Sequence, residues 1–150
     1  MLDKSDFLRV VELTPLVAID LVVCSSQGQI LMGKRVNRPA QDFWFVPGGR
    51  IMKGERLEEA FRRISSAELG LTCKIEDARL LNAFTHLYDD NFAGAPGIST
   101  HYVVLAYRLD LDLDLMRLPP QQHQGYRWVD ENDATGNVHP NSLAYFAYLH

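Results

Sequence analysis

One carboxylate in this sequence lies where ordinary packing does not call for a charge. Four apolar residues recur at helical spacing in the segment that precedes it: Leu57, Ala60, Phe61 and Ile64. At about 100° per residue, Glu68 falls roughly 20° from the first of them, so it faces the core side of the helix. The last helical turn disfavours negative charge, and burying an unpaired carboxylate is costly. Glu68 therefore either reaches out to an arginine or ligates a metal ion that faces the preceding glycine loop.

Basic side chains gather on both sides of that glycine loop. Lys34, Arg35 and Arg38 lie within five residues of one another, and Arg50 directly follows Gly48–Gly49. Such clusters are usually solvated loops. Guanidinium groups also match phosphate oxygens bidentately, and glycine lets a ligand approach the backbone closely. The sequence leaves both interpretations open, a solvated loop and a diphosphate clamp.

Several polar residues interrupt segments that otherwise read as strands. Asp20 lies inside an apolar strand, which indicates that it sits at the mouth of a site or bonds a cationic group. His86 and Tyr88 come near the end of one predicted strand, and His101 and Tyr102 near the start of another. Histidines in strands are more often hydrogen-bonded core or surface groups than catalysts.

The elements that must position these residues follow from periodicity and from capping residues. We predict helices over 6–13 (capped by Ser5), 56–69 (ended by Gly70) and 141–149 (after Pro140), strands over 16–24, 29–35, 44–46, 78–88, 100–111 and 126–129, and a loop over 118–125. This mixture is compatible with an α+β sandwich that has helices on either side of a mixed sheet. The pattern alone does not choose the topology.

Composition narrows the class of protein. A chain of 150 residues that is 47% apolar fits a single domain over 1–150. The net charge of −4 gives no electrostatic reason to expect a nucleic-acid partner. No segment reads as a membrane span or a signal peptide, and Cys24 and Cys73 read as reduced core thiols, so we expect a cytoplasmic protein without membrane contact.

The segment around Glu68 resembles a known motif. Gly49, Glu55, Arg63 and Glu68 follow one another at spacings of six, eight and five residues, and Gly70–Leu71 closes the segment. This pattern resembles the Nudix box of hydrolases that act on nucleoside-diphosphate-linked compounds. The resemblance implies the Nudix fold, an α/β/α sandwich with a mixed β-sheet.

Three positions of the box depart from the usual pattern. Ile64 stands where the family usually carries a glutamate, Ala67 replaces the first of two adjacent glutamates, and Ser65 replaces an apolar residue. Two carboxylates that usually gather divalent ions are therefore missing, which disfavours metal-activated attack of water on phosphorus. Segments between Thr14 and Phe146, including GKRVNRPAQ, WFVPGGR, HLYDDNF, QHQGYRW and NVHPNS–AYF, are similar to the GDP-mannose mannosyl hydrolase subfamily, which shares both losses.

That resemblance implies Mg²⁺-dependent hydrolysis of GDP-mannose, and of GDP-glucose, to GDP and free sugar by inverting displacement at the anomeric carbon. Mn²⁺ is an alternative ion. The implied metal ligands are the Gly49 carbonyl, Glu68 and the Gln122 amide oxygen. His123 is the implied base, because an imidazole with a pKa near ~6.5 suits activation of water at neutral pH.

Further residues take implied roles at the substrate. Arg35 and Arg50 neutralise the departing diphosphate, where negative charge grows. Asp20, His86, Tyr88 and Tyr102 match positions that hold the sugar or stabilise its developing positive charge. The resemblance also implies a homodimer that binds a GDP-sugar.

Two other functions compete with this one. An ordinary Nudix pyrophosphatase would cleave a nucleotide sugar or a nucleoside triphosphate at phosphorus, and Ile64 and Ala67 count against it. A non-catalytic domain that binds nucleotide sugars would have no need for the combination of Glu68, Gln122 and His123.

Overall fold

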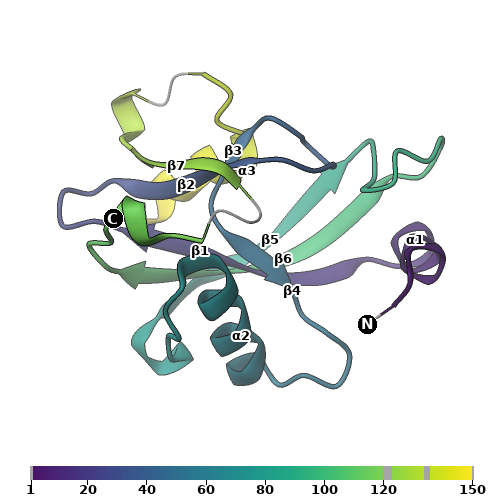
Figure 1. Ribbon diagram of the computed structural model, residues 1–150, viewed down its shortest axis with the longest axis horizontal. Coiled ribbons are helices and arrows are strands. Elements are labelled where there is room, and N and C mark those ends of the chain that lie inside the picture. Colours follow the sequence, from purple (N-terminus) through teal and green to yellow (C-terminus); the bar gives the residue numbers. More distant parts are fainter. Residues whose placement is uncertain (1, 120–122, 134–135, 150) are drawn as a thin grey trace.

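The computed structural model, which describes residues 2–119, 123–133 and 136–149, contains a seven-stranded mixed sheet (Figure 1). Its strands are β1 (Leu16–Cys24), β2 (Ile30–Arg35), β3 (Trp44–Phe45), β4 (Gly48–Arg50), β5 (Arg79–Tyr88), β6 (Thr100–Asp110) and β7 (His123–Val129). They run in the order β3-β2-β1-β6-β5, with β4 also paired to β1 and β7 to β2. The β1–β6 pair is parallel and the others are antiparallel, so the predicted mixed sheet is confirmed.

Helices cover both faces of this sheet. They are α1 (Lys4–Leu13), α2 (Leu57–Leu69) and α3 (Pro140–Leu143), with short 3₁₀ turns at Ile75–Asp77, Leu115–Arg117, Glu131–Asp133 and Ala144–Tyr148. In Figure 1, α2 lies in front of the sheet, α3 lies behind it, and α1 lies at one end beside the start of β1. The predicted arrangement of helices on either side of the sheet is confirmed.

Strand β1 is buried on both faces because its side chains alternate between two cores. Ile19, Leu21 and Val23 pack in one core with Phe61 and Ile64 of α2. Val22 and Cys24 pack in the other core, which contains Tyr145 and Phe146 of the C-terminal segment. The strand that carries Asp20 is therefore held from both sides.

Several predicted boundaries are wrong for identifiable reasons. The cap of α1 is Asp3 and not Ser5, because the Asp3 carboxylate accepts the Asp6 backbone N–H at 2.8 Å. Strand β7 begins at His123, inside the predicted loop, because pairing with β2 extends it to Arg35. Leu57 is 42% exposed because it lies in the first turn of α2, outside the core.

The C-terminal segment is not the single helix that its sequence predicts. It is α3 followed by a 3₁₀ turn over Ala144–Tyr148, and it buries Tyr145 and Phe146. A helix this short is marginal by itself, so tertiary packing decides its form. Gly48–Arg50, predicted as a ligand loop, also forms the short strand β4.

The cysteines and the helix lengths agree with the expectations from composition. Cys24 is buried, Cys73 is half-buried, and both are free thiols. Within the described part of the chain, no helix has the length and apolarity needed to cross a membrane.

Candidate active site

A cavity of about 200 Å³ opens where β1, β4, β5, β6 and α2 meet. Eight of the residues singled out from the sequence line it: Asp20, Arg35, Gly49, Arg50, Glu68, His86, Tyr88 and Tyr102. Two others cannot be placed beside them. Gln122 lies outside the described residues, and of His123 only the backbone is described, in β7 opposite Arg35. Residues far apart in the chain thus converge on one cavity.

Glu68 reaches this cavity from the last turn of α2. It is only 4% exposed, and its carboxylate accepts the backbone N–H of Gly48 at 3.3 Å. The predicted orientation toward the core side is confirmed. Gly70 ends the helix with a φ of 70°, as predicted, because glycine adopts the left-handed region without a steric penalty. The carboxylate therefore faces the glycine loop and not solvent.

Close packing excludes a side chain at Gly48 and leaves little room for one at Gly49. A Cβ on Gly48 would lie 2.5 Å from Asp20 Oδ1 and 2.6 Å from the Ile19 carbonyl oxygen. A Cβ on Gly49 would lie 3.0 Å from Cγ1 of Ile64. Ile64, which stands at a usual glutamate position of the box, fills the space beneath Gly49 with apolar atoms.

Asp20 is the most perturbed acid that lines the cavity. Burial raises the pKa of its carboxyl to about 7, although a hydrogen bond from Tyr145 and the charge of Arg35 lower it. The Tyr145 hydroxyl donates to Asp20 Oδ2 at 2.6 Å. Asp20 therefore changes protonation state near neutral pH. Of the two predicted environments, Asp20 has the first, since it lines the cavity; the hydrogen bond to it comes from the neutral Tyr145 hydroxyl, and Arg35 acts on it through its charge.

The aromatic and imidazole groups around Asp20 are neutral at pH 7. Burial lowers the pKa of His86 to about 4, with a further contribution from His139. Burial raises the pKa of Tyr88 to about 12 and also raises the pKa of Tyr102. These groups offer uncharged hydrogen-bond donors and acceptors, which suit sugar hydroxyls better than phosphate.

The two cavity arginines lie over aromatic rings. The Arg35 guanidinium carbon lies 5.2 Å from the centroid of Phe45, and that of Arg50 lies 4.6 Å from the centroid of Phe7. Of the predicted cluster of Lys34, Arg35 and Arg38, only Arg35 is among the described residues that line this cavity. Arg38 lines a second cavity, described below, and Lys34 lines neither, so the predicted cluster is divided.

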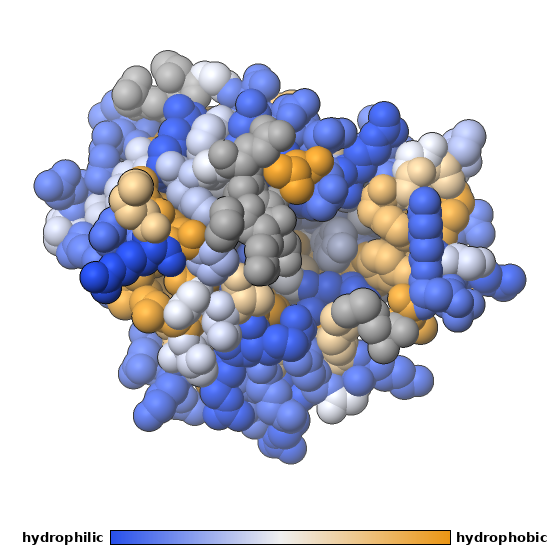
Figure 2. Space-filling view, viewed as in Figure 1, coloured by the Kyte–Doolittle hydropathy of each residue, from blue (hydrophilic) through white to orange (hydrophobic). Residues whose placement is uncertain are grey.

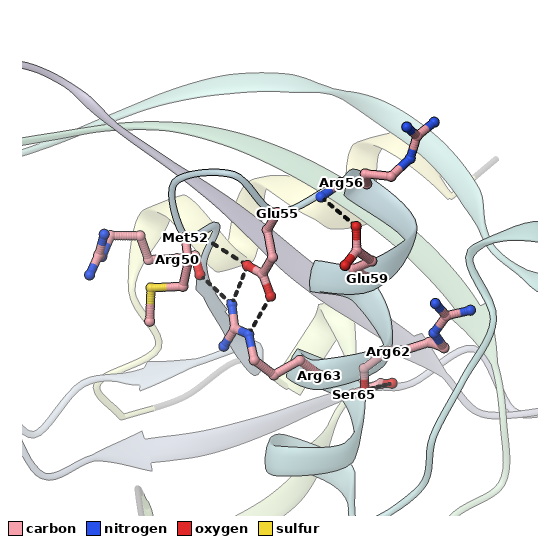
Figure 3. Close-up of polar contacts among 8 residues, drawn as sticks. All are labelled: Arg50, Met52, Glu55, Arg56, Glu59, Arg62, Arg63 and Ser65. Atoms are coloured by element: carbon pink, nitrogen blue, oxygen red, sulfur yellow. Dashed lines mark hydrogen bonds and ion pairs between the residues drawn. The ribbon is translucent and has the colours of Figure 1, made fainter. Parts of the chain in front are cut away.

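The loop that carries Arg50 is clamped to the outer side of α2 (Figure 3). Arg63 donates to both carboxylate oxygens of Glu55, at 2.7 and 2.9 Å, and to the Arg50 carbonyl at 2.8 Å. Glu55 also accepts the Met52 backbone N–H at 2.8 Å. Glu55 and Arg63, two residues of the predicted motif, thus hold this loop. The sequence spacing gave no indication that Arg63 contacts the Arg50 backbone.

The donor set of the cavity fits a single hard cation. No group of three His, Cys, Asp or Glu side chains in the described ranges could hold a metal ion. Mg²⁺ needs fewer, because it keeps several waters and often takes one or two carboxylates together with substrate phosphates. Glu68 and the Gly49 backbone, which line the same cavity, provide oxygen ligands of the right kind.

A second cavity, of about 340 Å³, adjoins the first. The two share Arg35, Asn37 and Tyr102 as lining residues. Phe7 and Phe92 line the second cavity, and their ring centroids are 4.8 Å apart. In Figure 2 the surface is hollowed beside the region where α1 lies, between mostly hydrophilic side chains and an apolar group.

Comparison with known proteins agrees with the fold and the motif. A model of the NUDIX domain matches residues 14–149. The chain therefore belongs to the Nudix family of hydrolases. Low-salt glycan biosynthesis protein Agl8 of Haloferax volcanii is 40% identical over 111 residues, which cover 73% of this chain and 68% of that protein.

More distant matches carry names that state other activities. An RNA pyrophosphohydrolase of Actinobacillus pleuropneumoniae serotype 5b is 31% identical over 123 residues, 74% of this chain and 57% of that protein. The crystal structure of a MutT NUDIX hydrolase from Burkholderia pseudomallei superposes with a TM-score of 0.71 at 24% identity, covering 91% of this chain and 99% of that one.

Sequence reasoning missed Phe45, which lines the cavity, and Tyr145 and Asn141, which bond lining residues. Asn141 donates to the Tyr88 hydroxyl at 3.4 Å, Tyr145 bonds Asp20, and Phe45 lines the cavity. The available signal was their place in the segments NVHPNS–AYF and WFVPGGR, which carry the resemblance without an assigned role.

Proposed function

We propose that the protein hydrolyses a GDP-linked sugar, GDP-mannose or GDP-glucose, to GDP and the free sugar. One observation carries this proposal: Glu68 is the single residue of α2 among those that line the first cavity within the described ranges. Ile64 is buried in the apolar core and Ala67 is exposed, so neither box position contributes a carboxylate. A multi-metal cluster that directs water at phosphorus has no ligands on this helix besides Glu68.

The charges of the cavity suit the departure of a diphosphate. Diphosphate is a stable anion that needs neutralisation more than it needs a proton. Arg35 and Arg50 supply two permanent positive charges, and Arg50 is fixed through the clamp on its carbonyl. Glu68 and the Gly49 carbonyl, with the Gln122 amide oxygen, would hold Mg²⁺, which lowers the charge on the leaving group when bound.

The bond changes balance in a single displacement. The oxygen of a water molecule forms a bond to the anomeric carbon while the bond from that carbon to the diphosphate oxygen breaks. The bonding electron pair leaves with GDP, and His123 takes the proton from the water. Asp20, His86, Tyr88 and Tyr102 hold the sugar, because they supply the neutral or near-neutral polar groups of the cavity.

The second cavity gives the nucleotide a place beside the sugar site. Arg35 lines both cavities, so a diphosphate at Arg35 lies between them. The Phe7 and Phe92 rings offer apolar faces for a base. The name of the Haloferax relative, a glycan biosynthesis protein, agrees with a nucleotide-sugar substrate.

A pyrophosphatase that attacks phosphorus is the second candidate. The RNA pyrophosphohydrolase of Actinobacillus pleuropneumoniae favours it, because it shares 31% identity with this chain over 123 residues. The two candidates differ in the bond that breaks, so products distinguish them directly.

The test is hydrolysis of GDP-mannose in ¹⁸O-water. We expect label in mannose, unlabelled GDP, and initial β-mannose from the α-linked substrate, because a single displacement inverts the centre. Mannose 1-phosphate and GMP among the products would establish the pyrophosphatase reaction instead, and label in GDP would show that water attacks the β-phosphorus with mannose as the leaving group. Initial α-mannose would indicate a covalent intermediate on a carboxylate, for which the cavity offers Asp20 besides the proposed metal ligand Glu68.

A further inference from the structure

The C-terminal run 137–146 contacts the strands that line the first cavity, although the proposed chemistry uses none of its residues. The Trp44 backbone N–H donates to the Asn137 carbonyl at 2.7 Å, and the His139 N–H donates to the Trp44 carbonyl at 3.0 Å. The Val46 backbone N–H donates to the Ser142 hydroxyl at 3.0 Å. The run is thus anchored to the chain immediately before the glycine loop.

Tyr145 extends from this anchored run to Asp20. Its side chain is completely buried, and its ring packs edge-to-face on Phe84 with centroids 5.0 Å apart. The hydroxyl donates to Asp20 Oδ2 at 2.6 Å. Oδ1 occupies the space that the missing side chain of Gly48 leaves, since a Cβ there would come within 2.5 Å of it. Tyr145 therefore holds Oδ2 by a hydrogen bond, while Oδ1 packs against Gly48.

We propose that Tyr145 is a positioning residue, whose hydroxyl holds the Asp20 carboxyl in the orientation that it presents to the ligand. Tyr145 is not among the described residues that line the cavity, so its effect passes through Asp20. A ring locked in the core loses little further freedom when its hydroxyl bonds, and such a donor can fix a carboxyl rotamer firmly. The inference rests on the proposed function, in which Asp20 contacts the sugar.

The first test compares two tyrosines of the same 3₁₀ turn. Tyr145→Phe should lower kcat by about 10–100-fold and change KM by less than about threefold, because the lost hydrogen bond orients a group and leaves the cavity shape intact. Tyr148→Phe removes the same atom from a residue that is 41% exposed and also packs on Phe84, and should stay within about twofold of wild type. Equal kcat for the two variants would overturn the proposal.

A double-mutant cycle with Asp20→Ala separates positioning from general stability. In the Asp20→Ala background, Tyr145→Phe should change kcat by less than about twofold, since its target is gone. The unfolding equilibrium constants of the four proteins should show a coupling of at least about tenfold. A kcat loss of the same factor with and without Asp20 would show that Tyr145 acts elsewhere.

The cycle distinguishes failure of this inference from failure of the proposed function. Turnover is counted as total nucleotide released, whichever bond breaks. If wild type releases free mannose and the effects of the two substitutions on the unfolding equilibrium are additive, the role of Tyr145 is contradicted and the proposed function stands. If the effects on the unfolding equilibrium are coupled but no GDP-sugar is turned over, the hydrogen bond from Tyr145 to Asp20 is supported and the proposed function is contradicted.

If the Tyr145→Phe protein does not fold, a second replacement at the same position tests the proposal. Incorporation of 3-fluorotyrosine at position 145 keeps the ring and the hydroxyl and makes the proton more acidic. The expected result is a change in kcat of at least about twofold with KM constant. An unchanged kcat with full incorporation would contradict the proposal.

Discussion

The two sides of helix α2 place two glutamates of one motif in opposite environments. On the outer side, the Glu55 carboxylate pairs with Arg63 and stabilises the loop before the helix, and the Glu55 side chain is 16% exposed. On the inner side, Glu68 is 4% exposed and faces the cavity. The same residue type therefore serves the loop on one side and a ligand on the other. Exposure and partner, and not the motif, distinguish the two roles.

The inner side of α2 also shows what the motif has lost. Ile64 is 1% exposed, and its Cγ1 would lie 3.0 Å from a Cβ on Gly49. Apolar packing therefore occupies a position where a carboxylate would bring a charge into the cavity. A base for activating water has to come from outside this helix.

The largest expected effect concerns that base. His123→Gln should lower kcat by about 10²–10⁴-fold, the usual contribution of a positioned base. The wild-type rate should rise with pH through an apparent pKa near neutrality, where an imidazole ordinarily titrates. Asp20, with a pKa of about 7, titrates in the same window. If the His123→Gln variant keeps the same rise of rate with pH, that rise is assigned to Asp20. If its kcat is unchanged, His123 is not the base.

Glu68→Gln tests the inner side of the helix directly. We expect turnover to fall by about 10²–10³-fold, because the amide removes the negative charge offered to the cation. The urea midpoint should stay near wild type. Glu58→Gln, on the exposed part of the same helix, is the matched control and should keep its activity. Near-normal turnover by Glu68→Gln would separate Glu68 from the metal.

Arg35→Gln and Arg50→Gln should each lower kcat by about 10²-fold and raise KM less. Their charges act on a leaving group whose charge grows in the transition state. Arg62→Gln removes an exposed guanidinium from α2 and should have no effect on kcat (Figure 3). A change confined to KM would make the arginine in question a ground-state binder of the diphosphate.

The smallest effect is expected on the outer side of the helix. Glu55→Gln should destabilise the fold by about 1 kcal/mol, since the pair with Arg63 is partly exposed and solvent weakens it. The hydrogen bond from Arg63 lowers the pKa of Glu55. Its stabilisation is therefore present above the unfolded-state pKa and is lost as the pH falls through the lower folded-state value. A urea midpoint that matches wild type at pH 7, or a difference that does not shrink as the pH falls through the folded-state pKa of Glu55, would contradict this.

The sequence predicted the strands and the course of α2 well because both depend on local periodicity. Strand β1 matches its predicted range residue for residue, and the burial of Glu68 follows from its angle on the helix. The form of the C-terminal segment could not be predicted, because Tyr145 is placed by contacts with Asp20 and Phe84 that are remote in sequence.

The candidate site divides in the same way. A resemblance in motif selected Asp20, Arg50 and Tyr102, and the fold brings all three to one cavity. It did not reveal that Arg63 binds the Arg50 carbonyl or that Gly48 makes room for Asp20, since both facts depend on how separate strands pack. Spacing identifies residues, and tertiary packing determines what they touch.

The hydrogen bond between Tyr145 and Asp20 can form only late in the synthesis of the chain. Its two residues are 125 positions apart in the chain. At about 5–20 residues per second, a ribosome adds Tyr145 about 6–25 s after Asp20. In the later part of that interval the nascent chain contains Asp20, both cavity arginines and Glu68, yet it still lacks the donor that bonds Asp20. The motif is thus synthesised before the C-terminal run, and Asp20 acquires its hydroxyl partner only when that run has emerged and docked.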